Sequence, residues 1–314
     1  MNYIVFDLEW NQGGAEEEVP GLPFEVIEIG AVKLNSGLMM TDGFSQLVRP
    51  QAYHQLHPVT GRLLPIQMEE LERGKLFPQV MREFLEWCGE EEYRFCTWGS
   101  MDLTEMQRNM KFYGMETLAE GPIPYLDVQK LFGLAYEPDT EKRSLEYAID
   151  FLKVKKEVSF HRAYSDAYYT AEVLSSMGGK EVLGNLSYDI FHPPISKAGE
   201  IKIQSGHSMK YISRLFADKA EALADREVVS SKCHLCHRNL RKKVKWFTMN
   251  GRHYDCVAYC EKHGYLKGKI RICWYDGGKV YIVKTTKFIT QEEAGVIAQR
   301  RNRAQERNQK GKSG

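Results

Sequence analysis

Two apolar segments close to the N-terminus constrain the fold of this chain most strongly. Residues 3–9 (YIVFDLE) and residues 26–34 (VIEIGAVKL) have the length and the residue types of β-strands, and a third strand is expected at residues 44–49. The turn at residues 35–37 predicts that the second and third strands are antiparallel neighbours. Because strands and helices alternate after this point, the sequence predicts an α/β domain with a mixed sheet flanked by helices.

The spacing of apolar residues and the cap signals predict the remaining elements. A strand is expected at residues 93–98, and the expected helices cover residues 77–88, 102–113, 125–132, 144–152 and 163–177, the last closed by Gly178 and Gly179. The chain is therefore expected to have four parts: the α/β domain at 1–185, a connector at 186–227 with one helix at about 207–224, a small zinc-bound α+β module at 228–290, and a helical to disordered basic tail at 291–314.

The formal net charge of +1 conceals an asymmetry along the chain. Residues 1–225 contain 22 Lys and Arg against 35 Asp and Glu, whereas residues 226–314 contain 21 against 7. Either the basic end is solvated surface with a disordered tail, or it supplies phosphate affinity to an acidic catalytic body. The N-terminus lacks a signal-peptide pattern, and no stretch approaches the roughly 18 apolar residues of a membrane-spanning helix. We therefore expect a cytoplasmic protein with no membrane partner.

Four acidic residues and one histidine stand at strand ends and helix starts. Asp7 and Glu9 are two positions apart on the first strand, so both carboxylates point to the same face. Adjacent carboxylates among apolar neighbours repel each other unless a cation neutralises them. Asp102 follows a predicted strand, and Asp166 falls in the first turn of a predicted helix, with His161 in the preceding loop. For Asp102 taken alone, helix capping is the simpler interpretation.

In combination and in this order, the three sites resemble a known family. Residues 6–9 (FDLE) match the first motif of the DEDDh (DnaQ-like) 3′→5′ exonucleases, which belong to the ribonuclease H-like superfamily. Residues 98–102 (WGSMD) match the second motif, and residues 161–170 (HRAYSDAYYT) match the third. The resemblance implies a ribonuclease H-like mixed sheet for about residues 1–180.

Two further segments refine the resemblance. Residues 25–34 look like the second strand of the family, and Thr97-Trp98-Gly99 looks closest to the branch that includes the histone-mRNA 3′ exonuclease and KapD-like proteins. The chain departs from the pattern at Trp10, where many relatives have Thr or Ser. This departure puts the family's shape of the terminal-nucleotide pocket in doubt. We expect Leu8 and Trp10 to bind the substrate, with Trp10 stacking on a base.

The resemblance also implies the chemistry of the site. Hard oxygen ligands suit two Mg²⁺ or Mn²⁺ ions, which would activate a water molecule for phosphodiester hydrolysis. By resemblance, Asp7 bridges both ions, Glu9 and Asp166 hold the ion next to the attacking water, and Asp102 supports the other ion. His161 is the implied general base, because imidazole titrates near neutral pH. The implied products are nucleoside 5′-monophosphates, released from the 3′ end.

The cysteines divide into scattered and clustered ones. Three lie singly among apolar residues and are expected in the core: Cys88, Cys96 and Cys273. Cys233 and Cys236 form a C-x₂-C pair, and Cys260 and His263 form a C-x₂-H pair that begins after 23 intervening residues. This spacing predicts a structural zinc ion on these four side chains, which would stabilise a small module. Unmetallated cysteines are the simpler alternative, and two nearby side chains compete as ligands: Cys256 and His253.

Basic and aromatic residues lie next to each other within the predicted module. A hairpin is expected at residues 245–254, followed by strands at 270–275 and 280–284. We expect the substrate-binding residues of the module to be Arg241, Lys242, Lys243 and Trp246, because charges that follow phosphates and rings that stack on bases suit single-stranded nucleic acid. A solvated basic hairpin and a protein-docking module are the alternatives.

Three hypotheses for function follow from these motifs. The first is a 3′→5′ exoribonuclease on single-stranded or short-overhang RNA, with the zinc module as a grip on the substrate. The second is a DNA exonuclease or proofreading factor, because nothing in the motifs distinguishes ribose from deoxyribose. The third is a non-catalytic nucleic-acid-binding adaptor that retains the fold, although the complete carboxylate set argues against it. The motifs name no protein partner.

Overall fold

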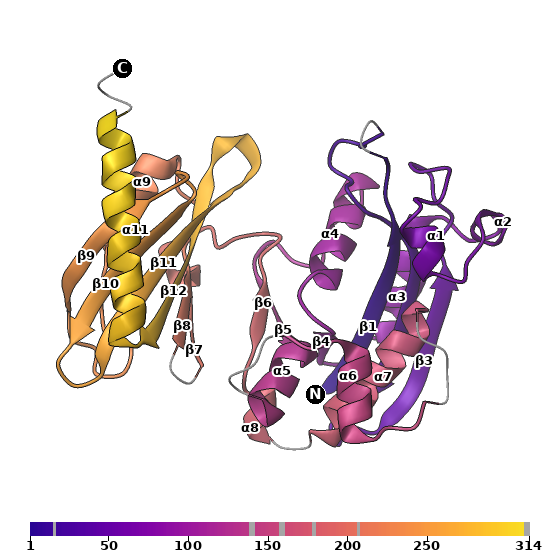
Figure 1. Cartoon of the computed structure of the whole chain (residues 1–314). Helices are drawn as coiled ribbons and strands as arrows, with labels where there is room; N and C mark the ends of the chain where they lie inside the picture. The colour runs from indigo at the N-terminus through magenta and orange to yellow at the C-terminus, as the bar shows by residue number, and fades with distance from the viewer. Residues whose placement is uncertain (15–16, 138–141, 157–160, 178–179, 206–207, 311–314) are drawn as a thin grey trace. The chain divides into compact units, whose positions relative to one another are not determined.

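The computed structural model describes residues 1–14, 17–137, 142–156, 161–177, 180–205 and 208–310. The chain divides into two compact units, Met1–His192 and Pro193–Gly314 (Figure 1). The first unit contains 17 Lys and Arg against 31 Asp and Glu, and the second contains 26 against 11. The charge asymmetry therefore follows the division into units. Within the described ranges, no helix combines the length and the apolar character that crossing a lipid bilayer requires.

A six-stranded mixed sheet forms the centre of the first unit, as predicted. Its strand order is β3-β2-β1-β4-β5-β6. The three strands β3, β2 and β1 are antiparallel, β1, β4 and β5 are parallel, and β6 is antiparallel to β5. The bounds are β1 Asn2–Asn11, β2 Glu25–Leu34, β3 Met40–Leu47, β4 Tyr93–Thr97, β5 Ile123–Asp127 and β6 Ser187–Asp189.

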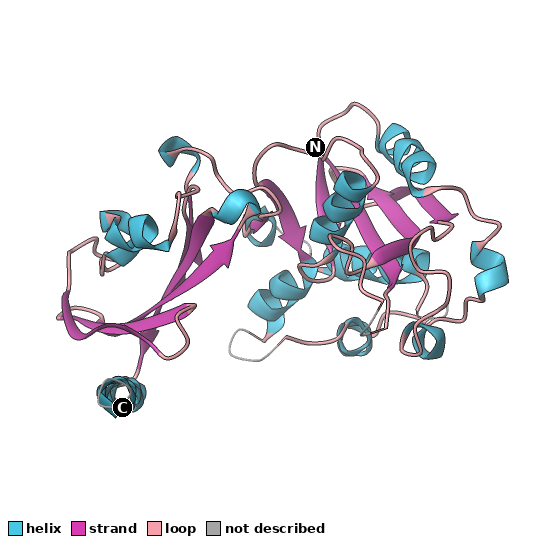
Figure 2. Ribbon diagram, turned by 90° about the horizontal axis from the view of Figure 1, so that it is seen from above, coloured by secondary structure: helices cyan, strands magenta, loops and turns pink. Residues whose placement is uncertain are grey.

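Helices cover both faces of this sheet (Figures 1 and 2). Ile4 and Phe6 of β1 pack in one core cluster with α3 and α4, whereas Tyr3 and Val5 pack in a second cluster with α5, α6 and α7. Burial of each of these apolar side chains stabilises the fold by about 1.5–3 kcal/mol. A one-residue shift of β1 would move every side chain to the opposite face, so this burial keeps the strand in one register. The helices are α1 Thr60–Leu63, α2 Met68–Leu71, α3 Phe77–Cys88, α4 Asp102–Phe112, α5 Val128–Tyr136, α6 Leu145–Leu152, α7 Ala163–Ser176 and α8 Lys180–Leu183.

The helix predicted at residues 125–132 is wrong in its first part. Residues up to Asp127 form β5, whose Leu126 pairs with Cys96 of β4, and α5 begins only at Val128. The Asp127 side chain caps this helix by accepting a hydrogen bond from the N–H of Lys130 at 3.0 Å. A buried strand that runs directly into a capped helix gives a continuous apolar segment, and its periodicity alone does not separate the two elements.

The close approach of α7 to β2 depends on Gly30. A Cβ atom at this position would lie 2.0 Å from the nitrogen of Tyr164 and 2.1 Å from the carbonyl carbon of Ala163. We expect Gly30→Ala to lower the free energy of unfolding by about 3 kcal/mol, because backbone must move to relieve the overlap. Denaturant titration measures this loss. Gly133→Ala in α5 is the control, since its Cβ would meet no atom within 4 Å. Equal stability of the two variants would contradict the prediction.

The second unit is built on a six-stranded antiparallel sheet of order β7-β8-β12-β11-β10-β9. One cluster of buried side chains joins β8, β11 and β12 to α9 and α10, and a second joins β9 and β10 to α11. The bounds are β7 Ile201–Ser205, β8 Ser208–Ile212, α9 Lys219–Ala224, α10 Arg226–Val229, β9 Arg241–Thr248, β10 His253–Cys260, β11 Gly264–Trp274, β12 Val280–Ile289 and α11 Gln291–Lys310.

The connector predicted at residues 186–227 differs from the structure. Its first residues form β6 of the first unit, and β7, β8, α9 and α10 belong to the second unit. The helix predicted at 207–224 is wrong over most of its length, because Ser208–Ile212 is a strand and α9 begins only at Lys219. β8 pairs locally with β7 and, at long range, with β12. Beside it, the Ser213 hydroxyl accepts a hydrogen bond from the N–H of Ile282, 69 residues later, and a local pattern does not contain that information.

Candidate carboxylate active site and cysteine cluster

Three carboxylates from two elements meet at the face of the sheet that α7 covers. Asp7 and Glu9 alternate with Phe6 and Leu8 on β1 and so point toward this helix. Asp166 lies in the first turn of α7. Each of the three acidic side chains offers an oxygen atom, and these atoms all lie within 4.8 Å of one another. The structure therefore brings together three of the four predicted carboxylates in one compact group.

Asp102, the fourth predicted carboxylate, lies next to this group. It begins α4 and is 5% exposed. Its Oδ1 accepts a hydrogen bond from the backbone N–H of Leu8 at 3.3 Å, across a separation of 94 residues. The bond ties the start of α4 to β1 between Asp7 and Glu9, so Asp102 has a positional role beyond capping. It stands outside the set of oxygens within 4.8 Å.

Burial raises the pKa of all four carboxyl groups, and neighbouring negative charges add to the effect. Burial is the larger cause for each of them, and it raises the pKa of Glu9 to about 8, of Asp102 to about 7 and of Asp166 to about 6. The pKa of Asp7 is raised well above its ordinary value by burial and by the charges of Asp102 and Glu9. Among the described residues, Oδ1 of Asp166 is buried without a hydrogen-bond partner. A half-buried oxygen cluster with an unpaired acceptor fits divalent cations such as Mg²⁺ or Mn²⁺.

His161 lies beside this cluster on the turn that precedes α7. It is exposed, and its backbone has a φ of 66°, a conformation that residues other than glycine rarely adopt. Its charge and its backbone hydrogen bond both act to lower the pKa of Asp166, against the larger effect of burial. The imidazole is therefore accessible to solvent next to the carboxylates. This is the position that a general base at this site requires.

A buried ion pair that sequence analysis missed supports the same turn. Glu28 of β2 lies opposite Glu9 of β1 and is 1% exposed. Its two carboxylate oxygens accept hydrogen bonds from Nε of Arg162 at 3.1 Å each. A terminal guanidinium nitrogen of Arg162 also donates to Oε1 of Glu28, at 3.0 Å. The N–H of Ala163 also donates to Glu28, at 3.3 Å. The sequence contained one signal for this ion pair, because Glu28 lies among apolar residues of a predicted strand and a buried carboxylate requires a partner.

We expect Arg162→Met to destabilise the first unit by roughly 3 kcal/mol, because it leaves the Glu28 carboxylate buried without its cation. Denaturant titration at pH 7 measures this free energy of unfolding. The double variant Glu28→Gln/Arg162→Met removes the uncompensated charge, so it should recover part of the loss. If the double variant is less stable than Arg162→Met alone, the buried charge is not the cause.

The structure corrects one of the two nucleotide-binding residues on β1. The side chain of Leu8 is 3% exposed and packs in the core cluster on the face opposite Asp7, so it does not point toward the carboxylates. Trp10 follows a register shift between Glu9 and Trp10, is half-buried, and packs on Phe24 with 5.4 Å between ring centroids. Stacking of Trp10 on a nucleotide stays a prediction.

Comparison with known families decides the identity of this unit. The exonuclease family RNase_T matches residues 4–174, more than half of the chain. The chain belongs to this exonuclease family. Its first unit is thus a DEDDh-type exonuclease domain with a ribonuclease H-like mixed sheet, as the motifs predicted.

Individual relatives of the exonuclease domain are distant. The 3'-5' exoribonuclease 1 of Rattus norvegicus is 26% identical over 163 residues, 49% of this chain and 46% of the relative. The chain thus matches about half the length of this curated relative. The "Probable 3'-5' exonuclease KapD" of Bacillus subtilis (strain 168) is 24% identical over 135 residues, 43% of this chain and 62% of the relative. The nuclease domain of 3'hExo, solved bound to rAMP, has a TM-score of 0.48 and 22% identity, covering 56% of this chain and 90% of that one.

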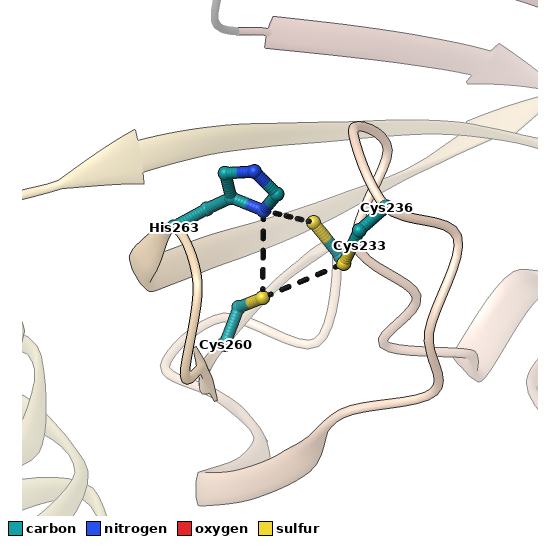
Figure 3. A group of neighbouring side chains, drawn as sticks. All are labelled: Cys233, Cys236, Cys260 and His263. Carbon is teal, nitrogen blue, oxygen red and sulfur yellow. Dashed lines mark hydrogen bonds between the residues drawn. The ribbon is translucent and has the colours of Figure 1, made fainter.

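Outside the exonuclease domain, the four side chains predicted to bind zinc converge (Figure 3). Sγ of Cys233 lies 3.4 Å from Nδ1 of His263, Sγ of Cys236 lies 3.6 Å from Sγ of Cys260, and Cys260 lies 3.6 Å from Nδ1 of His263. Zn–S and Zn–N bonds of about 2.3 and 2.0 Å in a tetrahedron require S–S and S–N separations of roughly 3.8 and 3.5 Å. The cluster therefore has the dimensions of a tetrahedral zinc site.

The competing ligands lie elsewhere in the second unit. Cys256 is 2% exposed and pairs with Gly268 of β11. Its sulfur packs so close to this glycine that a Cβ atom there would lie 2.7 Å from it. Nδ1 of His253 lies 3.3 Å from the Asn250 side-chain amide. Neither belongs to the group that converges. The three scattered cysteines are buried, as expected of core residues: Cys88, Cys96 and Cys273.

The predicted basic strand is at the edge of the second sheet. Arg241 and Lys243 on β9 are exposed and Lys242 is half-buried, so the basic side chains are available to a phosphate backbone. Trp246 is half-buried, and packing inside the second unit takes up part of its ring. Its Nε1 donates a hydrogen bond to the carbonyl of Val229 at 2.9 Å, and its ring packs on the core cluster of the second unit. The structure thus shows a packing role for this aromatic residue, and stacking on a base stays a prediction.

Proposed function

We propose that this protein is a metal-dependent 3′→5′ exonuclease that acts on single-stranded or short-overhang RNA. The observation that carries the proposal is the meeting of Asp7, Glu9 and Asp166 within 4.8 Å, beside the exposed His161, in a domain of the exonuclease family. A non-catalytic adaptor is disfavoured, because a nucleic-acid-binding surface gains nothing from buried carboxylates that repel phosphate.

Each residue of the site has a distinct role in this proposal. Asp7, Glu9 and Asp166 hold two Mg²⁺ or Mn²⁺ ions, with Asp102 as support from the start of α4. When bound, the ions supply an activated water molecule and neutralise charge on the leaving oxygen. Nε2 or Nδ1 of His161 accepts the proton from the attacking water, since its exposed imidazole lies next to Asp166. Released products are nucleoside 5′-monophosphates.

The preference for RNA rests on the relatives. The mammalian relatives carry the name 3'-5' exoribonuclease 1, whereas the name of KapD specifies no sugar. A DNA exonuclease is therefore the second candidate. A contact to the 2′-hydroxyl distinguishes the two sugars.

Digestion of end-labelled oligonucleotides tests the proposal. RNA and DNA strands of equal sequence, labelled at the 5′ or the 3′ end, are incubated with Mn²⁺ or Mg²⁺. We expect a 5′ label to report a ladder that shortens one nucleotide at a time, and a 3′ label to appear at once as mononucleotide. Faster loss of RNA supports the first candidate, and faster loss of DNA supports the second. Binding without cleavage under any metal condition contradicts an exonuclease.

We also propose that β9 supplies affinity for long substrates. Replacing Arg241 and Lys243 by Gln should raise KM for long strands several-fold and lower the salt slope of log K by about 0.7 per charge removed. Hydrolysis of di- and trinucleotides should be unchanged, because these substrates do not extend beyond the carboxylate site. Lys279→Gln, at an exposed lysine outside β9, is the control. An unchanged salt slope in the double variant contradicts this role.

A further inference from the structure

A pocket in the second unit concentrates positive charge beside the cysteine cluster. Its volume is about 250 Å³, and it is lined by residues of β7, β8, α10, β12 and the segment that carries Cys233. Lys202 and Lys232 in its lining are exposed, whereas Lys284 is 1% exposed. Among the described residues that line it, Glu227 is the only carboxylate. The pocket thus combines accessible lysines with one lysine removed from bulk water.

Neutral acceptors hold the buried ammonium group of Lys284. Nζ donates hydrogen bonds to the carbonyl of Glu227 and to Oγ of Ser230, the latter at 3.0 Å, and lies 5.3 Å from the centroid of the Tyr211 ring. The carboxylate of Glu227 forms its ion pair with Lys202 instead, at 2.8 Å. Burial lowers the pKa of Lys284 to about 8. A buried ammonium of this kind is costly, and an anion beside it offsets part of that cost.

The lining suits a phosphate group better than a carboxylate. The pocket is lined by three lysines and one glutamate, so its lining carries two more positive than negative charges if the Cys233 thiol is left out. A phosphate monoester carries about −1.5 to −2 at pH 7, and lysine is a common phosphate ligand. Thr286 also lines the pocket, and its hydroxyl oxygen lies 3.3 Å from Nδ1 of His234. The volume is just below the roughly 300–1,000 Å³ of typical small-molecule sites, which limits the ligand to about the size of a mononucleotide.

We propose that this pocket binds a phosphate group, carried by a free nucleotide or by the end of a nucleic-acid chain. The proposal does not depend on the exonuclease activity, because no residue of the carboxylate site or of β9 takes part. Lys202 and Lys232 bind the phosphate oxygens, and the buried charge of Lys284 adds electrostatic attraction.

Calorimetric titration of the full chain tests this site, with no Mg²⁺ or Mn²⁺ added so that the acidic carboxylate cluster repels phosphate. The ligands are inorganic phosphate, adenosine 5′-monophosphate, adenosine, and short oligonucleotides with a phosphate or a hydroxyl at the terminus. We expect both phosphate compounds to bind, adenosine to fail, and Lys232→Gln to weaken binding at least ten-fold. Lys279→Gln, at an exposed lysine outside the pocket, should bind as the wild type does.

The oligonucleotides distinguish the two sources of the phosphate. Tighter binding of the phosphate-terminated strand than of the mononucleotide assigns the pocket to a chain end, and the reverse order assigns it to a free nucleotide. Lys232→Gln is at an exposed position and should fold normally, which unfolding temperatures verify. Equal affinity of Lys232→Gln and wild type overturns the proposal, and so does the absence of any phosphate binding up to millimolar concentration.

Discussion

Asp7→Asn is expected to abolish hydrolysis and, in metal-free buffer, to stabilise the first unit. The oxygens of Asp7 lie within 4.8 Å of those of Glu9 and Asp166, so the variant removes a central ligand of the proposed ions. A loss of several kcal/mol of transition-state stabilisation lowers kcat by roughly 10³-fold or more. The same change removes a buried charge that repels its neighbours. We expect a gain of about 1 kcal/mol in the free energy of unfolding without metal.

The pH dependence of stability tests the same cluster. Glu9, Asp102 and Asp166 have folded pKa values of about 8, 7 and 6, above their ordinary values near 4. Between pH 4 and 8 the folded protein therefore binds more protons than the unfolded protein, and the contribution of these groups to stability falls as pH rises. Metal-free wild type should lose stability from pH 5 to pH 8, and saturating Mn²⁺ should suppress this loss.

Thermal unfolding and initial rates, measured on the same preparations, check both effects. Glu86→Gln changes an exposed glutamate on α3 and should match wild type in both measurements. The pH-dependent loss should be smaller in Asp7→Asn, because the remaining carboxyl groups lose one like-charged neighbour. Retained activity in Asp7→Asn would sink the assignment of the site. Lower stability of this variant in metal-free buffer would show that its carboxylate is not under electrostatic strain.

Cys260→Ser is expected to remove one zinc ion per chain and to lower the stability of the second unit by roughly 5 kcal/mol. Structural zinc supplies about 10–16 kcal/mol of apparent binding energy in peptides that do not fold without it. The loss here should be smaller, because two core clusters hold this sheet independently of the cysteines. The unfolding temperature of the second unit should then fall by about 10 °C or more. Cleavage of dinucleotides should persist, since the carboxylates lie in the first unit.

Metal analysis and two-step thermal unfolding measure these changes. Cys256→Ser is a matched control, because Cys256 is also a buried cysteine of β10 but stands outside the converging group. It should retain one zinc per chain. If Cys260→Ser keeps its zinc while Cys256→Ser loses it, the ligand set is wrong. If the purified wild type contains no zinc and does not gain any on addition, the cluster is a set of reduced thiols.

Sequence was sufficient where the chemistry depends on local geometry. The two-residue period of a strand places Asp7 and Glu9 on one face, and the first turn of a helix places Asp166 near the strand ends. Metal-ligand spacing likewise identified Cys233, Cys236, Cys260 and His263, which the structure brings together. These predictions required short-range rules and the order of motifs along the chain.

Tertiary structure decided what depends on contacts between distant segments. The hydrogen bond from Leu8 to Asp102 spans 94 residues, and the ion pair of Glu28 with Arg162 spans 134. The pairing of β8 with β12 places part of the predicted connector, residues 186–227, in the sheet of the second unit. The indole of Trp246 packs on the core of the second unit, which the local sequence did not predict. The sequence by itself therefore identified the residues that are predicted to carry the chemistry. The fold decided which neighbours bury and orient them, because the pairing of distant segments leaves no periodic signal in the sequence.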